Sequence, residues 1–534
     1  DSKRTGNPDL KFGRKAKVAN KTLFGSLRGA LIPKTDAVNA HNAPAYRLPP
    51  KHAFAQYAAT GCLNSTFYAG ATDQLKAVLA LTAEIEPEFI AKTAIYCRER
   101  GYMKDMPALL CAALSIRDIK LLERVFGRVL DNGKMLRNFV QVVRSGVVGR
   151  KSLGTAPRRM IRDWLDARDD KSVFFASVGQ TPSIGDVIKM VHPKPGTDGR
   201  KALYAYLIGR EYESENLPKL VQDFEAFKVG TGSEAPAVPF EMLTALPIGT
   251  SGWTAIARNA SWQQTRVNLN TFARHGVFEE PGMTRKIATR LSDHVAIKKA
   301  RAFPYQIMTA SAMADEKVPA EIRTALTEAL EVATRNVPEI KGKVYVCPDV
   351  SGSMSMAATG YRKGATSVVR CIDVAAMVAA SVLRKNRGAA VIPFENEVVK
   401  INLEPTDSIM TNARKLASIG GGGTNCSAPL ELLNRNKAEG DLVIFVSDNQ
   451  SWVDAGRGLG TQTMAEWNAF KRRNPSARMA CIDIQPYGTT QAKEREDILN
   501  VGGFSDHVFE LITEFAAGRL NSGHWVGVIE SIEL

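Results

Sequence analysis

The sequence predicts a long α-helical region followed by an α/β domain with a parallel sheet, and three observations support this fold class. From about residue 72 to 335, apolar residues recur at helical spacing between proline and glycine breakers. After about residue 342, short apolar runs alternate with helical stretches, which is typical of a doubly wound sheet. The excess positive charge lies entirely before residue 341. We therefore expect a multidomain chain.

The helical region is expected to consist of short helices in tandem. Between 121 and 130, for example, apolar side chains follow an i, i+1, i+4, i+5 pattern that lines one helix face. Such a density of short helices indicates stacked pairs of the HEAT type, although a compact helical bundle stays an alternative because no clean sequence repeat is present. The predicted divisions are a basic N-terminal arm at 1–50, with a cationic cluster at Lys11, Arg14, Lys15 and Lys17, helical repeats at 51–338, and the α/β domain at 339–534.

The α/β domain is expected to contain five strands with helices between them. Ligand sites in such sheets lie where the strands end, at their carboxyl edge. The candidate strands are 343–348, 389–394, 441–447, 478–484 and 507–511, and the candidate helices are near 364–386, 407–418, 425–437 and 462–473.

Charge separates the two regions. The chain of 534 residues has a formal net charge of +15. Residues 1–340 hold 49 lysines and arginines against 34 acidic residues, whereas 341–534 hold 21 of each. A basic region beside a neutral one suggests a polyanionic partner, RNA or DNA rather than a membrane, because no basic segment is paired with a bulky apolar face. A basic surface that serves only solubility is the alternative.

Cysteine usage and hydropathy bear on the compartment. The seven cysteines are scattered, odd in number and without a Cys-x-x-Cys pair, so we expect a reduced, cytoplasmic protein without structural zinc. Asp1 to Thr5 begin no hydrophobic segment, and no apolar run approaches the length of a membrane span, so neither a signal peptide nor a membrane partner is expected.

Three polar segments predict a metal site. Asp349, Ser351 and Ser353 follow the first candidate strand with the spacing Asp-x-Ser-x-Ser. Thr424 follows a run of four glycines, and Asp448 ends another candidate strand. Carboxylate and hydroxyl oxygens are hard ligands of the type that Mg²⁺ prefers. For the first segment alone, an N-capped helix start is the simpler explanation.

Together these segments resemble the metal-ion-dependent adhesion site of von Willebrand factor A domains, which have a Rossmann-like sheet. The resemblance implies that the hydroxyls of Ser351, Ser353 and Thr424 bind a divalent metal, and Mg²⁺ is the metal expected. It implies that Asp349 and Asp448 act mostly through bound waters, and that an open coordination position accepts an acidic group of a partner.

Basic residues gather before and on one helical segment. In the stretch 157–167, Arg158, Arg159 and Arg162 fall on one arc and apolar residues on the other. The preceding glycine-rich loop holds Arg144, Arg150 and Lys151. Glycines allow close backbone approach, and these cations would neutralise phosphates. The alternative is a solvated arginine face.

In this order the motifs resemble the Ro autoantigen, or TROVE, family over about residues 50 to 534. The residues that support the resemblance are Gln141–Gly146, the arginine-rich helix running into Asp163–Trp164, the run Asp186–Pro195, and Ser447–Trp452 beside the metal motif.

The resemblance implies a HEAT-like ring of helical repeats closed by the metal-site domain. It implies that Y-type small noncoding RNA binds the outer basic face, which would include Lys189, with His192 and Lys194 at the family's His-x-Lys-Pro segment. Single-stranded 3′ ends of misfolded RNAs would pass through the central hole, as part of RNA quality control. An exoribonuclease is a further implied partner, and a monomer is expected. Between Phe174 and Gly185 the chain is mostly small or neutral where the family is basic, which leaves the details of Y RNA contact open.

Two other functional classes are alternatives. A metal-dependent protein-adhesion or scaffold module would account for 341–534 but not for the charge of the first part. An enzyme is not expected, because hydroxyls outnumber acids at the metal motif and no histidine and carboxylate cluster supplies a base. His192 could equally be a helix-end cap.

Overall fold

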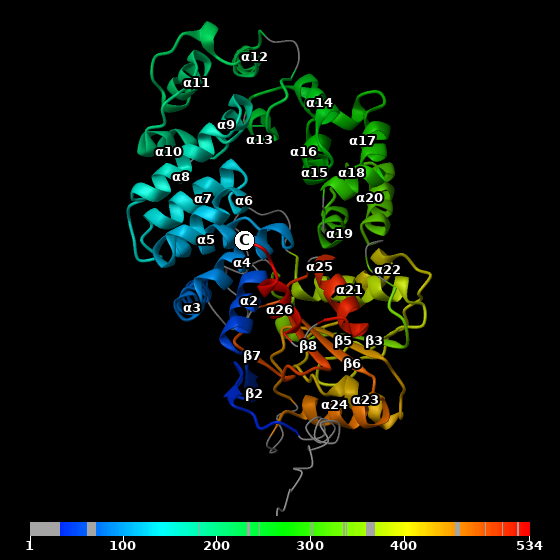
Figure 1. Ribbon diagram of the computed structural model, residues 1–534. Helices are drawn as coiled ribbons and strands as arrows, with labels where there is room; N and C mark the ends of the chain where they lie inside the picture. The colour runs from blue at the N-terminus through cyan, green and yellow to red at the C-terminus, as the bar shows by residue number, and fades with distance from the viewer. Residues whose placement is uncertain are drawn as a thin grey trace, which may run out of the picture.

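The computed structural model describes residues 32–534 apart from 61–70, 180, 232–234, 245, 301, 303, 335–336, 338, 359–368, 454–459, 486, 505 and 521–522. The helices of the N-terminal two thirds lie in a ring that the C-terminal α/β domain completes (Figure 1). Within the described part of the chain, every helix is too short or too polar to cross a bilayer.

The ring is built from short helices that pack in stacked pairs, as expected for HEAT-like repeats. Neighbours such as α4 and α5, α5 and α7, or α17 and α20 make the main contacts. The helices are α2 (Pro50–Thr60), α3 (Ala71–Glu84), α4 (Pro87–Glu99), α5 (Asp105–Arg117), α6 (Ile119–Val129), α7 (Gly133–Arg144), α8 (Thr155–Asp166), α9 (Asp170–Phe175), α10 (Ile184–Val191), α11 (Asp198–Ile208), α12 (Lys219–Lys228), α13 (Phe240–Thr244), α14 (Thr250–Asn259), α15 (Trp262–Val267), α16 (Leu269–Arg274), α17 (Met283–Ser292), α18 (His294–Ala300), α19 (Pro304–Ala312) and α20 (Ala320–Ala333), with 3₁₀ turns η1 (Ser214–Asn216) and η2 (Val277–Glu279).

Local sequence explains where several of these helices begin. The Asp118 side chain accepts from Lys120 N and Leu121 N at the start of α6, and Ser183 forms a capping box with Asp186 at the start of α10. The arc of Met160, Ile161, Trp164 and Leu165 on α8 is buried, as its spacing predicts. Burial of such apolar stripes, rather than helix propensity, holds short helices together.

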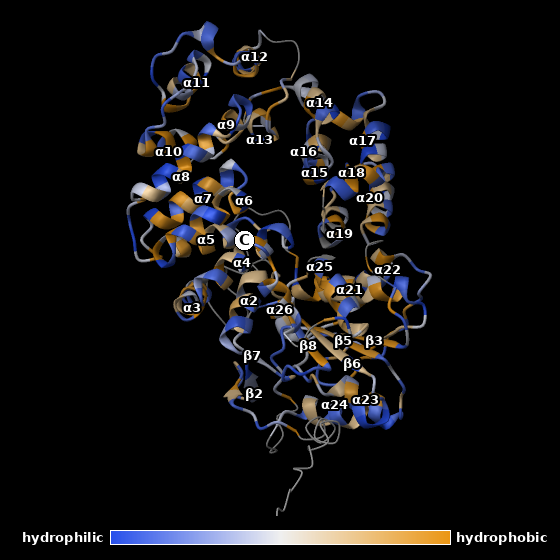
Figure 2. Cartoon of the chain, in the orientation of Figure 1, coloured by the Kyte–Doolittle hydropathy of each residue, from blue (hydrophilic) through white to orange (hydrophobic). Residues whose placement is uncertain are grey.

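The α/β domain is a five-stranded parallel sheet with helices on both faces. The strand order is β4-β3-β5-β6-β8, and Cys347 pairs with Phe445 in the central register. Figure 2 shows strongly hydrophobic residues along β3 and β5, as expected for strands buried on both faces. The elements are β3 (Val344–Pro348), η4 (Gly352–Ser355), α21 (Cys371–Lys385), β4 (Ala390–Val391), α22 (Ile409–Ala417), α23 (Ala428–Arg435), β5 (Leu442–Ser447), α24 (Gln462–Arg473), β6 (Arg478–Asp483), β8 (Ile498–Gly502), α25 (Asp506–Ala516) and α26 (His524–Glu530).

One expected strand is wrong. Residues 507–511 belong to helix α25, and β8 is the fifth strand instead. Val508, Leu511, Ile512 and Phe515 are all buried, which is the i, i+3, i+4, i+7 spacing of a helix face. The short run was too brief for its spacing to distinguish a strand from this longer helical stripe.

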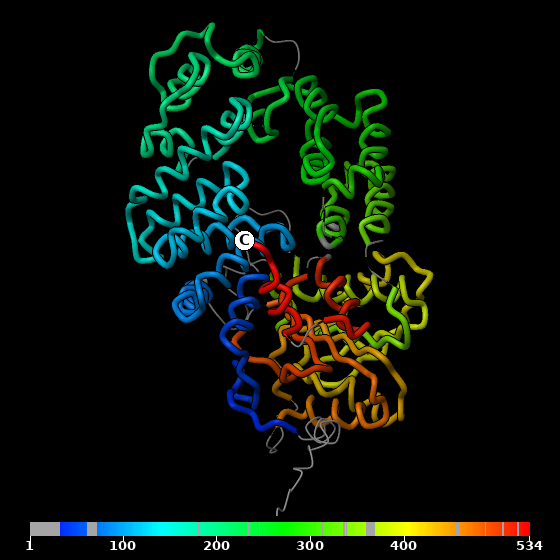
Figure 3. Tube along the Cα trace, in the orientation of Figure 1, coloured from blue at the N-terminus to red at the C-terminus, as the bar shows by residue number. Residues whose placement is uncertain are grey.

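The ring contacts the α/β domain at both of its ends. At one end, α20 packs against α22, and Glu331 accepts from Ile409 N (3.0 Å) and pairs with Arg384 (3.3 Å). At the other end, the C-terminal helix α26 packs against α2 and α4, so the last helix of the chain lies beside the first helices of the ring (Figure 3). Lys92 Nζ donates to Glu530 O (2.8 Å) across this contact.

The segment before α2 also packs on the α/β domain. Strands β1 (Ala37–Val38) and β2 (Pro44–Arg47) form a small antiparallel sheet with β7 (Thr489–Thr490). The expected cationic cluster at Lys11, Arg14, Lys15 and Lys17 lies outside the described residues.

Candidate metal centre and nucleic-acid interface

The first loop of the candidate metal centre leaves the carboxyl end of β3. Asp349 is fully buried, and its backbone N–H donates to Val446 O (2.9 Å) of the neighbouring strand. Its two carboxylate oxygens accept from Ser351 N (2.9 Å) and from the Ser447 hydroxyl (2.6 Å). The carboxylate is therefore held in one orientation at the edge of the sheet.

The second loop brings Thr424 to the same place. The Thr424 hydroxyl lies 3.0 Å from Ser351 Oγ, which lies 3.3 Å from Ser353 Oγ. Gly420 and Gly421 adopt φ values of 149° and 123°, which side chains rarely tolerate, and Gly352 N donates to Gly422 O (2.9 Å). Three hydroxyls from two loops thus converge on one small volume.

The third loop supplies Asp448 at the end of β5. Its side chain is buried, and Oδ2 has no hydrogen-bond partner among the described residues. Burial, and secondarily the charge of Asp448, raises the pKa of the Asp349 carboxyl above its ordinary value, and burial raises the pKa of Asp448. Two buried carboxylates, one with an unpartnered oxygen, beside three hydroxyls fit a hard divalent cation.

The five predicted metal ligands therefore lie together. Among the described residues, no three histidine, cysteine or acidic side chains are grouped so that they could hold a metal ion by themselves, so a metal here would depend on the hydroxyls as well. Hard oxygen donors of this kind favour Mg²⁺ over Zn²⁺.

Sequence reasoning missed the residues that position the glycine run. After β4, the Glu395 carboxylate accepts from Gly422 N (2.8 Å) and Asn396 Oδ1 accepts from Gly423 N (3.0 Å). Asn425 N also donates to Glu395 O (2.9 Å). A signal was available, since these polar residues follow a candidate strand whose end lies at the same sheet edge as Asp349 and Asp448.

The N-terminal segment holds the third loop. Ala40 N donates to Gln450 Oε1 (3.0 Å), and Asn39 Nδ2 donates to Ser451 O. The His41 and Trp452 rings lie 5.2 Å apart with an interplanar angle of 32°. A segment more than 400 residues away in the chain thus supports the loop that carries Asp448.

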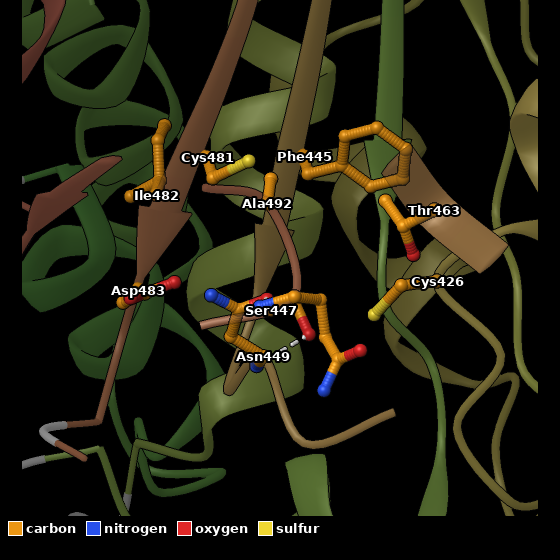
Figure 4. Close-up of a pocket in the computed structure, with 10 residues that line it drawn as sticks. Cys426, Phe445, Ser447, Asn449, Thr463, Cys481, Ile482, Asp483 and Ala492 are labelled. Carbon is orange, nitrogen blue, oxygen red and sulfur yellow. Dashed lines mark hydrogen bonds between the residues drawn. The ribbon is translucent and has the colours of Figure 1, made fainter. Parts of the chain in front are cut away.

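Figure 4 shows the side chains beneath this loop, where Asn449 N donates to Ser447 Oγ (2.8 Å). With Cys426, Cys481 and Asp483 they line a buried cavity of about 10 Å³, which has room for about one water. A cavity this small serves packing rather than the binding of a substrate.

The predicted basic residues of α8 differ in their surroundings. Arg158 is exposed, and its side chain makes no ion pair or hydrogen bond within the described ranges. Arg159 is also exposed and pairs with Glu123 (2.7 Å), whereas Arg162 is half-buried. The arginine arc therefore faces solvent, as expected, with one of its charges partly neutralised.

The basic residues of the glycine-rich loop also differ in their surroundings. Arg144 and Lys151 are exposed. The Arg150 guanidinium instead donates to three backbone carbonyls, those of Ser115 (2.9 Å), Ser152 (2.9 Å) and Leu153 (2.8 Å). Arg150 consequently fixes the loop to the end of α5.

The remaining basic residues follow α10. Lys189, His192 and Lys194 are exposed. His192 has a left-handed backbone (φ 51°) and its N–H donates to Ile188 O (2.9 Å), so it ends α10 as a cap while its ring stays accessible. Lys194 lies with Asp166, Asp169 and Asp170 around a hollow of about 560 Å³.

Comparison with known proteins bears on the whole chain. The family described as the Ro60 vWA domain matches residues 343–516. The chain is 22% identical over 514 residues to the RNA-binding protein RO60 of Deinococcus radiodurans, covering 89% of this chain and 94% of that protein. The chain is thus similar to a Ro protein over nearly its whole length, and its α/β domain matches the Ro60 vWA family.

A crystal structure of the Deinococcus radiodurans RO (RSR) protein has the same fold. It aligns with a TM-score of 0.61 at 18% identity, over 88% of this chain and all of that one. In this chain the loops of the candidate metal centre lie at the end of the von Willebrand factor A-type sheet, beside a cleft of about 760 Å³. The cleft is lined by Ser351 and Gly352 from the first loop, by Met308 of α19 and by Met313, which directly follows that helix.

Proposed function

We propose that this chain binds RNA, with structured RNA on the basic face of the helical ring and single-stranded 3′ ends at its centre. The confinement of the net charge of +15 to residues 1–340 carries the proposal. The related protein of Deinococcus radiodurans, named an RNA-binding protein, supports it.

The proposed outer surface comprises the exposed cations of α7, α8 and α10. It includes Arg144, Lys151, Arg158, Lys189 and Lys194. Such cations bind phosphates without reading sequence, so affinity depends on salt. The proposed ligand is a Y-type small noncoding RNA, with the exposed His192 ring available to stack on a base.

At the centre of the ring, selection would be steric. A passage that admits one strand but not a duplex favours misfolded RNAs with an unpaired 3′ tail. Bound Y RNA would limit access to that passage. The role that follows is non-catalytic, in RNA quality control, with the protein acting as a monomer that delivers RNA to an exoribonuclease.

We extend the proposal to a resident Mg²⁺ ion. Ser351, Ser353 and Thr424 would hold it through hydroxyls, and Asp349 and Asp448 through waters. When bound, the ion supplies a coordination position for an anionic oxygen of a ligand. Glu395 and Asn396 would keep the glycine run, and with it Thr424, in place for the ion.

A gel-shift titration tests the RNA proposal. The probe is a hairpin RNA with a single-stranded 3′ extension, compared with the same hairpin blunt-ended, at two salt concentrations. The tailed RNA is expected to bind more tightly, and binding of both RNAs is expected to weaken at higher salt. The triple variant Arg158→Ala/Arg159→Ala/Arg162→Ala should bind both RNAs more weakly.

A matched variant controls for net charge. Arg387, Arg435 and Arg472 are exposed on the α/β domain, and replacing all three with alanine removes the same charge. This variant is expected to bind RNA nearly as the wild type does. Equal loss in both triple variants would contradict an RNA surface on α8, and failure of the wild-type protein to bind either RNA would overturn the proposal.

The second candidate function is a protein-adhesion module. The cleft beside the metal-site loops favours it, since an acidic side chain of a partner could enter there. If Asp349→Ala abolishes capture of a protein partner while RNA binding is unchanged, the α/β domain acts as this module.

A further inference from the structure

Trp452 stands apart from the other tryptophans of the chain. The chain has six, and the other five are at most 5% exposed. Trp452 is 42% exposed, and Val453 beside it is 38% exposed. A single exposed apolar side chain is ordinary on a protein surface, so its exposure alone decides nothing.

The indole is, however, held rigidly. Trp452 N and Val453 N donate to Thr424 O at 3.0 and 3.2 Å. An ideal Cβ atom on Gly423 would lie 2.5 Å from Trp452 Cζ2, so the indole rests on the backbone of the glycine run. The ring of His41, in the N-terminal segment, packs at a tilt against the indole. Asn39 and Ala40, in the same segment, donate hydrogen bonds to the loop that carries Trp452.

The position of this aromatic pair relates it to the metal centre. Thr424, whose backbone carbonyl accepts a hydrogen bond from Trp452 N, also supplies one of the three converging hydroxyls. The other end of the same glycine run, Gly420 and Gly421, lines the cleft that extends to Met308 and Met313. One end of the glycine run thus lines the cleft beside α19, and its other end, at Gly423, lies against the Trp452 indole.

The chemistry of the cleft and of the indole suits a nucleotide chain. Arg414 lines the cleft, and its exposed side chain has no ion pair or hydrogen bond within the described ranges. A free guanidinium and a cation site bind phosphates, whereas a flat, immobilised indole stacks on a base. An acidic peptide would use the first two features and leave the indole without a role.

We propose that Trp452, supported by His41, is a stacking platform for a base of single-stranded RNA whose backbone crosses the metal centre. The inference rests on the proposed RNA-binding function and assigns the direction in which a 3′ tail runs once it leaves the ring. Because any base can stack on an indole, the platform would increase the number of tail nucleotides that are bound without requiring a particular sequence.

The test compares Trp452→Ala with Trp452→Phe in the full-length protein. The probe is a hairpin RNA with a homopolymeric 3′ tail, alongside the same RNA with abasic tail positions. Because the side chain is exposed, both variants are expected to fold. Loss of one stacked base should weaken binding of the tailed RNA by about 5- to 150-fold in Trp452→Ala, and much less in Trp452→Phe.

Two comparisons locate the effect. The abasic tail should weaken binding to the wild type but cause little further loss in Trp452→Ala, since the same contact is removed twice. Tyr212→Ala removes a similarly exposed ring (40%) at a distant site and should leave tail binding unchanged.

Equal binding of the tailed RNA by Trp452→Ala and wild type would overturn the inference while leaving the RNA-binding function intact. Absence of binding to tailed and blunt RNA by the wild type would instead refute the proposed function on which it rests.

Discussion

The helical ring and the α/β domain handle charge in opposite ways. In the described part of the ring from 71 to 334, Arg137 is the one buried charged side chain, and it bonds backbone carbonyls. The α/β domain instead buries Asp349, Asp448 and Asp483. The charges of the ring lie at the surface, where they attract ligands over a distance and are screened by salt. The buried charges of the α/β domain instead lie in a site that only a ligand of matching charge and size can occupy.

This comparison predicts that the two regions lose function differently. Changes in the α/β domain should act on a specific ligand or on stability, and changes on the ring should act additively on RNA affinity. Four measurements test it, in order of expected effect.

The largest effect is expected at the metal centre. Asp349→Ala should reduce Mg²⁺ affinity by about 100-fold or more, because the carboxylate both carries charge and orients the first loop. Isothermal titration calorimetry with Mg²⁺ measures it, and Glu397→Ala, a nearby exposed acid, is the control. Undiminished affinity in Asp349→Ala would show that the converging hydroxyls are not a metal site.

A second prediction concerns pH. Burial raises the pKa of Glu494 to about 8, although Asn500 donates to it. A carboxyl whose folded pKa exceeds its unfolded value favours folding at low pH, and this stability is lost as pH rises from about 4.5 to 8. Between pH 5 and 7, wild type should therefore lose about 2.5 kcal/mol more unfolding free energy than Glu494→Gln.

Urea denaturation at the two pH values measures this difference. Glu496→Gln, on an exposed side chain two residues away, should behave as the wild type does. The same pH dependence in Glu494→Gln and wild type would mean that the buried carboxyl is not the group that titrates.

The third prediction separates two adjacent cations of the glycine-rich loop. Arg150→Ala should lower the free energy of unfolding by about 1–3 kcal/mol, since three carbonyls lose their donor. Lys151→Ala should change it by less than about 0.5 kcal/mol and weaken RNA binding instead. Equal stability of the two variants would remove the structural role of Arg150.

The smallest effect is expected on the ring surface. Arg158→Ala should weaken RNA binding uniformly across sequences. It should also reduce the slope of log K against log salt by about one unit, the loss of one phosphate contact. An unchanged slope would place Arg158 outside the RNA interface, and Arg159→Ala should have a weaker effect because Glu123 already neutralises that charge.

Much of this architecture was determined by the sequence alone. Helical spacing before residue 335 and alternating apolar runs after it predict the two regions, because periodicity reflects which face each element buries. The ends of β3 and β5 placed Asp349 and Asp448 at one sheet edge, since parallel strands share their carboxyl ends. The short run 507–511 failed as a strand because so few residues do not distinguish the two periods.

The tertiary structure alone decided which distant residues meet. Asn39 supports the loop of Asp448, and Glu395 holds the glycine run, through contacts that no local pattern encodes. It also decided that Arg150 faces backbone carbonyls while Lys151, its neighbour, faces solvent. Local sequence sets the conformation of each segment, but burial and hydrogen-bond partners depend on how segments far apart in the chain pack, and these decide whether a polar side chain supports the fold or meets a ligand.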